Sequence, residues 1–192
     1  ERMQLADAMA DISHQLRTPL TAINLTLSML GREGLPEQER RALLQELRRL
    51  VTRMEWLGET LLKMSRIDAG AVSFREESCR AADIIQRAVQ PLAVPMELRG
   101  ITLETAAGEE CFTGDAAWSA EALGNVLKNC MEHAASYIRV SARETALFTE
   151  ITVQDDGPGF RAEDLPRLFE RFYRGKDAAP ASVGIGLALT RM

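Results

Sequence analysis

One of the two histidines in the sequence, His14, stands in the segment DISHQLRTPL, residues 11–20. Apolar residues around it recur at helical spacing, and His14 lies about 200° around such a helix from Ile12 and from Leu16. The imidazole is therefore predicted to face solvent, where a free ring nitrogen can act as a nucleophile and accept a phosphoryl group. A surface histidine alone is more often without function, so this prediction needs a second, independent motif.

Pro19 follows His14 by five residues inside the same helical pattern. A proline cannot donate a backbone hydrogen bond, and its ring crowds the carbonyl of Gln15, so we expect a kink at this point. The helix does not end there, because the apolar spacing continues beyond it. The residues that continue it are Leu20, Ile23, Leu27 and Leu30.

Three further motifs could bind a nucleotide. Asn125 and Asn129 stand at i and i+4 in LGNVLKNCMEHA, and amide oxygens on one helix face suit Mg²⁺. In QDDGPGF, the Asp155 carboxylate can accept a hydrogen bond from an exocyclic amine such as that of adenine, and Gly157 and Gly159 permit close backbone approach. In SVGIGLALT, Gly184 and Gly186 open a helix whose amide groups favour phosphate.

His14 is predicted to lie on the first of two long helices that pack together. Apolar residues alternate at three- and four-residue spacing over residues 5–30 and again over 43–64, and the short segment GREGLPEQE joins the two stretches. This predicts an antiparallel helical hairpin. A hairpin alone cannot cover two long apolar stripes, so we expect a four-helix bundle made by two chains. The alternative is that the hairpin packs on another part of its own chain.

Shorter elements alternate after residue 67 and must carry the nucleotide motifs. We predict strands at 71–76, 100–106, 137–144 and 147–156, and helices at 81–93, 116–135, 162–172 and from 184 onwards. The fold class is therefore α+β, with a hairpin domain over residues 1–67 and an α/β sandwich over residues 68–192. The joint near residues 67–70 is the expected hinge.

The composition excludes several classes of protein. A formal charge of −5 and a pI near 5.2 argue against a nucleic-acid surface. The three cysteines have no metal-ligand or disulfide-framework spacing, and no apolar run is long enough to cross a bilayer. The sequence thus predicts no nucleic-acid partner and no direct membrane contact from this segment.

The segment SHQLRTPLTAI resembles the H box of the sensor histidine kinases of two-component systems. The resemblance implies that His14 is the phosphorylated residue and that Thr18 serves phosphatase activity. The family has Glu or Asp where this chain has Gln15, and that acidic group is regarded as the base that takes the imidazole proton. Gln15 can still orient a water molecule or hydrogen-bond the ring.

The nucleotide motifs stand in the order found in the ATP-binding domain of these kinases, a Bergerat-type (GHKL) fold shared with gyrase and Hsp90. The resemblance implies that ATP and Mg²⁺ bind here, with Asn129 on the metal, Asn125 beside it and Asp155 on adenine. It implies that Gly157 and Gly159 shape the adenine side and that Gly184, Gly186 and Leu187 shape the phosphate end. Phe169 and Phe172 would anchor a lid, and Arg174 would reach the phosphates.

The chain departs from the family pattern in places. Glu132 stands where many relatives have a phosphate-binding lysine, and His133 stands where an aromatic residue is common, so ATP affinity is expected to be low unless Lys128 substitutes. The sequence stops at Met192, where the family fold continues through two further strands, so the ATP-binding domain is expected to be truncated at its C-terminus.

The resemblance implies ATP-dependent autophosphorylation of His14, then transfer to an aspartate on a response-regulator receiver domain, by a homodimer that also has phosphatase activity. It further implies that the chain is the cytoplasmic portion of a sensor protein of the inner or plasma membrane. Two alternatives stay open. One is an enzyme whose main activity is phosphatase, and the other is a degenerate dimeric scaffold with weak or no kinase activity.

Overall fold

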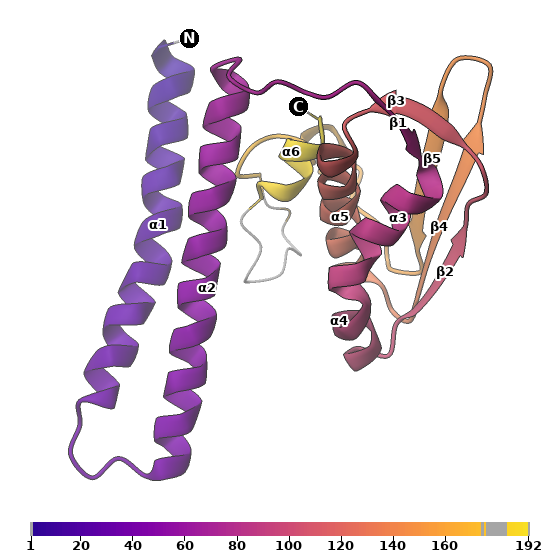
Figure 1. Ribbon diagram of the computed structural model, residues 1–192. Helices are drawn as coiled ribbons and strands as arrows, with labels where there is room; N and C mark the ends of the chain where they lie inside the picture. The colour runs from indigo at the N-terminus through magenta and orange to yellow at the C-terminus, as the bar shows by residue number, and fades with distance from the viewer. Residues whose placement is uncertain (1, 174, 176–183, 192) are drawn as a thin grey trace. The chain divides into compact units, whose positions relative to one another are not determined.

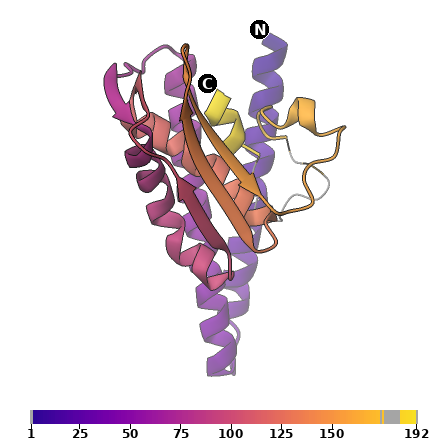
Figure 2. The same ribbon diagram turned by 90° about the vertical axis from the view of Figure 1, so that its right-hand side faces the viewer.

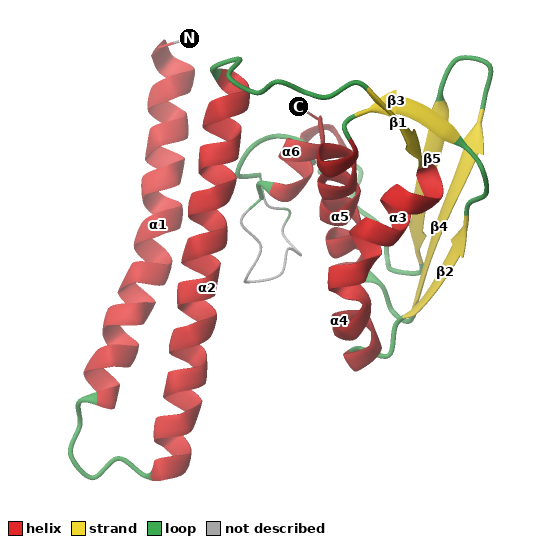
Figure 3. Ribbon diagram, in the orientation of Figure 1, coloured by secondary structure: helices red, strands yellow, loops and turns green. Residues whose placement is uncertain are grey.

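The computed structural model describes residues 2–173, 175 and 184–191, and the chain divides into two compact units, Glu1–Ala71 and Val72–Met192 (Figure 1). The first unit is entirely helical and the second is mixed (Figure 3). Across the described ranges, every helix is too short or too polar to cross a lipid bilayer.

The first unit is an antiparallel hairpin of α1 (Arg2–Leu30) and α2 (Glu37–Asp68). Pro36 precedes the first turn of α2, and the acidic Glu37 and Glu39 follow it, where the helix dipole favours negative charge. Pro19 is buried inside α1, and the helix continues through it for eleven more residues, to Leu30. The predicted hairpin is therefore confirmed, and the proline does not end its helix.

The apolar residues of the hairpin fall into two stripes with different exposure. One stripe of α2 is buried at seven-residue spacing, through Leu50, Leu57 and Met64, and burying each such side chain contributes about 2 kcal/mol. The other stripe stays open to solvent, with Leu44 at 45% and Val51 at 42% exposed. The hairpin thus buries one apolar seam internally and leaves other apolar side chains of α2 uncovered, and Leu20 and Leu27 of α1 are exposed as well.

The second unit is a layer of helices on one face of a sheet, as Figure 2 shows. The larger sheet has the order β2 (Thr102–Ala106), β4 (Tyr137–Glu144), β5 (Thr149–Asp155), with β2 parallel to β4 and β4 antiparallel to β5. A separate antiparallel pair consists of β1 (Glu77–Arg80) and β3 (Cys111–Gly114). The helices are α3 (Ala81–Val89), α4 (Ala93–Leu98), α5 (Ala116–His133) and α6 (Gly186–Arg191).

The core of this unit lies between α3, α5 and the inner face of the sheet. Strand β4 alternates as a half-buried strand should, with Ile138 and Val140 fully buried and Arg139 exposed between them. Leu127 of α5 and Ile84 of α3 close over these positions in the same apolar cluster. This packing holds the C-terminal end of α5 over the end of β5, where the predicted nucleotide residues lie.

The N-terminus of α5 is tied to the segment that enters the unit. Asp115 caps the helix by accepting hydrogen bonds from the backbone N–H groups of Ala117 (3.0 Å) and Trp118 (3.2 Å). Its other carboxylate oxygen accepts from the N–H of Arg75 at 3.1 Å, and the Phe74 ring packs edge-on against Trp118 at 5.5 Å. These contacts bind residues 74–75 to the second unit.

Two predicted elements differ from the structure, and one observed strand was not predicted. The strand predicted at 71–76 is irregular, and β1 begins at Glu77 instead, because its register is set by β3, a short strand that the sequence did not reveal. The helix predicted at 162–172 is reduced to one 3-10 turn, Leu165–Arg167. Pro166 and the left-handed backbone of Phe172 (φ 62°) are incompatible with a continuous helix there.

Candidate functional site

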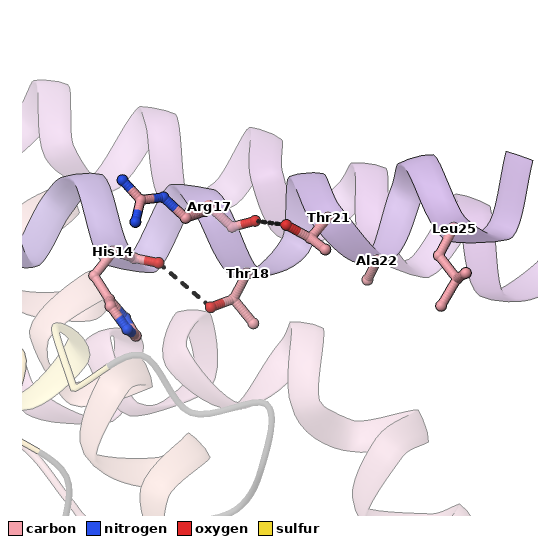
Figure 4. A pocket seen from close by; sticks show the side chains of 6 residues that line it. All are labelled: His14, Arg17, Thr18, Thr21, Ala22 and Leu25. Atoms are coloured by element: carbon pink, nitrogen blue, oxygen red, sulfur yellow. Dashed lines mark hydrogen bonds between the residues drawn. The ribbon is translucent and has the colours of Figure 1, made fainter. Parts of the chain in front are cut away.

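His14 lies on the exposed surface of α1, as its position in the helical pattern predicts. Figure 4 shows it at one end of an open hollow along this helix face. Thr18, also exposed, lies one turn further on and donates a hydrogen bond from Oγ1 to the carbonyl of His14 at 3.4 Å. Gln15 is half-buried beside them. The hollow is lined by His14, Arg17, Thr18, Thr21, Ala22 and Leu25.

Asn125 and Asn129 are half-buried on α5, and Asn125 faces the start of α6. The Asn125 Nδ2 atom is buried and has no hydrogen-bond partner among the residues that the structure describes. A Cβ placed on Gly186 would lie 3.6 Å from Asn125 Oδ1, so this amide is directly against the first turn of α6. Thr190 holds α6 in place by donating to the carbonyl of Ala122 at 3.4 Å. Leu187 is half-buried in the same short helix.

Asp155 ends strand β5 on the inner face of the sheet, opposite the buried Ile138. Its Oδ1 accepts a hydrogen bond from the N–H of Gly157 at 2.8 Å. Burial raises the pKa of the Cys130 thiol, on α5, to about 12, and the nearby Asp155 carboxylate adds to the effect.

Two glycines of the predicted motifs are required by their surroundings. A Cβ on Gly157 would overlap the carbonyl oxygen of His133 and come within 2.7 Å of Asp155 Oδ1. Gly184 has φ +74°, and a Cβ there would overlap the carbonyl oxygen of Tyr173. Gly159 has a positive φ of 72° with open space around it. The backbone therefore approaches closely on both sides of the predicted nucleotide position.

The segment between these glycines holds the predicted lid anchors. Phe169 is 41% exposed and Phe172 is half-buried, and the N–H of Phe172 donates to the carbonyl of Gly184 at 2.8 Å. The hydroxyl of Tyr173 bonds to the buried Asp164 carboxylate, and this hydrogen bond raises the pKa of Tyr173. Arg174, predicted to reach the phosphates, lies outside the described residues.

Asp156, next to Asp155, forms a separate clamp that the sequence did not reveal. Its carboxylate accepts hydrogen bonds from the N–H groups of Ala135 (2.9 Å), Ser136 and Tyr137 (both 3.0 Å), and from the Ser136 hydroxyl at 2.8 Å. These donors hold the pKa of Asp156 well below its ordinary value. The clamp fixes the turn from α5 into β4 and so holds the loop after β5.

Sequence reasoning also missed two groups beside Asp155. No role was predicted for Cys130, and the Asp155 carboxylate contributes to its raised pKa only because α5 packs over β5. His133, the last residue of α5, packs edge-on against Phe160, in the loop after β5, at 5.9 Å between ring centroids. Because the family commonly has an aromatic residue at the position of His133, the sequence could have indicated the contact between His133 and Phe160.

The residues present fit an adenine nucleotide with its metal ion. The Asn125 amide is a buried donor without a partner among the described residues, the backbone is closely packed at Gly157 and Gly184, and the Asp155 carboxylate keeps acceptor capacity beyond its one observed donor. Within the described ranges, no three or more His, Cys, Asp or Glu side chains cluster as metal ligands. An Mg²⁺ ion in this site would therefore depend on amide oxygens, water and phosphates.

Comparison with known protein families matches two domain models to the chain. Residues 4–70 match the His Kinase A (phospho-acceptor) domain, and residues 114–192 match the histidine kinase-, DNA gyrase B-, and HSP90-like ATPase domain. The first match covers the hairpin that carries His14. The second covers α5, the Asp155 loop and α6.

Similar curated proteins are bacterial histidine kinases. The signal transduction histidine-protein kinase AfsQ2 of Streptomyces coelicolor is 32% identical over 94% of this chain and 35% of its own length. The kinase/phosphatase MprB of Mycolicibacterium smegmatis is 32% identical over 98% of this chain and 39% of its own length. The chain thus spans little more than a third of the length of these relatives.

Solved structures give the same fold. The Acinetobacter baumannii histidine kinase AdeS aligns with a TM-score of 0.72 over 92% of this chain and 83% of its own, at 19% identity. The mycobacterial sensor histidine kinase MprB aligns with a TM-score of 0.54 over 61% of this chain and 76% of its own, at 23% identity. At these identities the likeness speaks for the fold alone.

Proposed function

Because the chain belongs to the sensor histidine kinases of two-component systems, we propose that it transfers the γ-phosphoryl group of ATP to His14. The observation that carries the proposal is an exposed imidazole on α1 in a chain whose second unit carries the hydrogen-bonded Asp155 and Gly157 and a buried Asn125 amide without a partner among the described residues. In this assignment residues 1–67 are the dimerisation and phosphotransfer domain, and residues 68–192 are the catalytic domain.

In the proposed site, Asp155 accepts a hydrogen bond from the exocyclic amine of adenine, and Gly157 and Gly159 give the base room. Gly184, Gly186 and Leu187 shape the phosphate end next to Asn125, where Arg174 also acts. Asn129 would hold Mg²⁺ through its side-chain oxygen, and the bound ion would offset phosphate charge. Phe169 and Phe172 anchor the lid segment to the domain.

In the proposed reaction, the lone pair on His14 Nε2 attacks the γ-phosphorus in line, the bond to the bridging oxygen breaks, and ADP leaves. The Nδ1 proton of the ring is released to a base, which Gln15 cannot be, so Gln15 orients water or the ring instead. The phosphoryl group then passes to an aspartate of a receiver domain. We propose a homodimer, supported by the uncovered apolar side chains of the hairpin.

A second activity is favoured by Thr18. Its hydroxyl is exposed in the hollow beside His14, where it can orient water toward a phosphorylated receiver aspartate. The relative MprB is named a kinase/phosphatase, which agrees with this assignment. We further propose that the chain is the cytoplasmic portion of a membrane-bound sensor, since PrrB, another relative, is named a sensor-type kinase.

The test is incubation with γ-labelled ATP and Mg²⁺, with His14→Ala and Asp155→Asn as matched variants. Acid-labile, alkali-stable label is expected on the parent chain and on neither variant. ATP binding without label would overturn the kinase assignment in favour of the phosphatase or the scaffold. Release of phosphate from a phosphorylated receiver domain, lost in Thr18→Ala, would then separate these two.

A further inference from the structure

The carboxylate of Asp156 lies where the end of β5 meets the turn from α5 into β4. Its Oδ1 atom accepts hydrogen bonds from three successive backbone N–H groups, those of Ala135 (2.9 Å), Ser136 (3.0 Å) and Tyr137 (3.0 Å). Its Oδ2 atom accepts from the Ser136 hydroxyl at 2.8 Å and from the Ser136 N–H at 3.1 Å. An ionised carboxylate has about four acceptor positions, so these donors leave Asp156 little capacity to bind a ligand itself.

The same residue is also held through its backbone. The N–H of Asp156 donates to the carbonyl of Tyr137 at 3.2 Å. On its C-terminal side, Gly157 lies so close to the carbonyl of His133 that a Cβ would overlap that oxygen. On its N-terminal side, Asp155 accepts from the N–H of Gly157 at 2.8 Å. The position of the Asp155 carboxylate relative to the end of α5 therefore depends on the bonds that hold Asp156.

We propose that Asp156 is a positioning residue for adenine recognition: by binding the N–H groups that follow α5, it holds Asp155 in the orientation that accepts the exocyclic amine. This inference rests on the proposed function, in which Asp155 binds adenine. It assigns Asp156 no contact with the nucleotide, because the acceptor positions of its carboxylate are largely filled. Loss of these hydrogen bonds is therefore expected to reduce the selectivity for the amine rather than abolish nucleotide binding, since other residues form the phosphate end of the site.

Asp115 offers a matched comparison at the other end of α5. Its carboxylate also accepts from three backbone N–H groups, those of Arg75 (3.1 Å), Ala117 (3.0 Å) and Trp118 (3.2 Å). The 18 residues of α5 span about 27 Å, so this cap is remote from the Asp155 loop. Removing the Asp115 carboxylate therefore costs a similar set of hydrogen bonds without touching the loop that contains Asp155.

The experiment measures the affinities of the chain for ADP and for inosine diphosphate, which lacks the exocyclic amine, by titration calorimetry with Mg²⁺. The ratio of the two affinities reports how well Asp155 selects the amine. Asp156→Ala removes all the acceptors and is expected to lower this ratio about three- to tenfold. Asp156→Asn keeps Oδ1 for the three N–H groups, and its amide can donate to the Ser136 hydroxyl, so it is expected to keep most of the preference.

Asp156→Ser, whose short hydroxyl cannot reach all three N–H groups, is expected to lower the ratio in the same direction, and it replaces Asp156→Ala if alanine prevents folding. Asp115→Ala is the control, and it is expected to lower the melting temperature without changing the ratio. A ratio lowered to the same extent by Asp115→Ala would show that loss of stability alone is enough, and it would overturn the inference.

A purely structural role for Asp156 would make its variants lower the melting temperature and keep the parent ratio, and that result would overturn the inference. An Asp156→Asn ratio as low as that of Asp156→Ala would overturn it too, because the hydrogen-bond geometry would then not be responsible. If Asp155→Asn abolishes the preference while Asp156→Ala and Asp156→Ser keep it, the proposed function stands and only the role of Asp156 fails. A parent chain with no preference for ADP would overturn both.

Discussion

The two units hold their chemical groups in opposite ways. His14 is exposed on a helix surface, and the hydrogen bond that Thr18 makes next to it reaches only its backbone carbonyl, at 3.4 Å. Asp155 and Asp156 are instead held by donors from the turn after α5, from β4 and from their own loop. A phosphoryl acceptor must meet different partners in turn, whereas a nucleotide site gains affinity when its groups are already oriented.

The largest expected effect separates phosphoryl acceptance by His14 from nucleotide binding by the second unit. In His14→Gln, phosphorylation is expected to fall to background, because no other ring nitrogen is placed at this motif position. ADP affinity and melting temperature are expected to stay at the parent values, because an exposed side chain contributes little to either. Label incorporation and calorimetry measure the two properties. Weakened ADP binding in this variant would contradict the proposal that the first unit accepts the phosphoryl group and the second unit binds the nucleotide.

The next effect tests how tightly the Asp155 loop is packed. Gly157→Ala places a Cβ against the carbonyl of His133 and within 2.7 Å of Asp155 Oδ1, so it is expected to destabilise the second unit by about 1–3 kcal/mol and weaken ADP binding at least tenfold. Chemical denaturation and calorimetry provide the readouts. Gly124→Ala is the control, since its Cβ meets only the carbonyl of Ala88, at 4.0 Å, and alanine favours a helix.

A pH titration tests the Asp156 clamp. The hydrogen bonds to Asp156 lower its folded-state pKa below the ordinary value of 3.8, so its contribution is fully present above about pH 4 and is lost as the pH falls through the lower folded pKa. Asp156→Asn is therefore expected to melt at a lower temperature than the parent at pH 7, with the difference shrinking toward pH 3. A difference that stays constant with pH would show that the charge is not responsible.

The smallest effect is expected on the hairpin surface. Glu37 and Arg41 form an ion pair at 2.9 Å with both side chains well exposed, and such pairs contribute little because water and salt screen them. Glu37→Gln is expected to change the free energy of unfolding by less than about 0.5 kcal/mol, as measured by urea denaturation. A larger loss would mean that the hairpin depends on its surface charges as the second unit depends on Asp156.

The sequence predicted the elements whose stabilising contacts are local or strictly periodic. The heptad spacing of Leu50, Leu57 and Met64 gave the hairpin, and the alternation around Ile138 and Val140 gave β4. The short strand β3 was missed because CFTG has no pattern of its own and is stabilised by pairing with β1, more than thirty residues earlier. The helix at 162–172 was wrong because apolar spacing outweighed Pro166 in the prediction.

The candidate site likewise combines residues that a sequence motif predicts with contacts that depend on long-range packing. Asp155, Gly157 and Gly184 stand in motifs that can be read from the chain, and the structure gives physical reasons for the two glycines. The thiol of Cys130 and the donors to Asp156 could not be predicted, because they depend on how the end of α5 lies over β4 and β5. The roles assigned to the motif residues stay predictions until nucleotide binding is measured.

The contact between Phe74 and Trp118 has a spectroscopic consequence. The chain has two tryptophans, Trp56 on α2 and Trp118 on α5, so each unit carries its own intrinsic fluorophore. A Trp56→Phe chain would emit only from the indole that the Phe74 ring touches at 5.5 Å. The emission wavelength and the quenching of Trp118 would report whether residues 74–75 stay packed against α5 during phosphorylation.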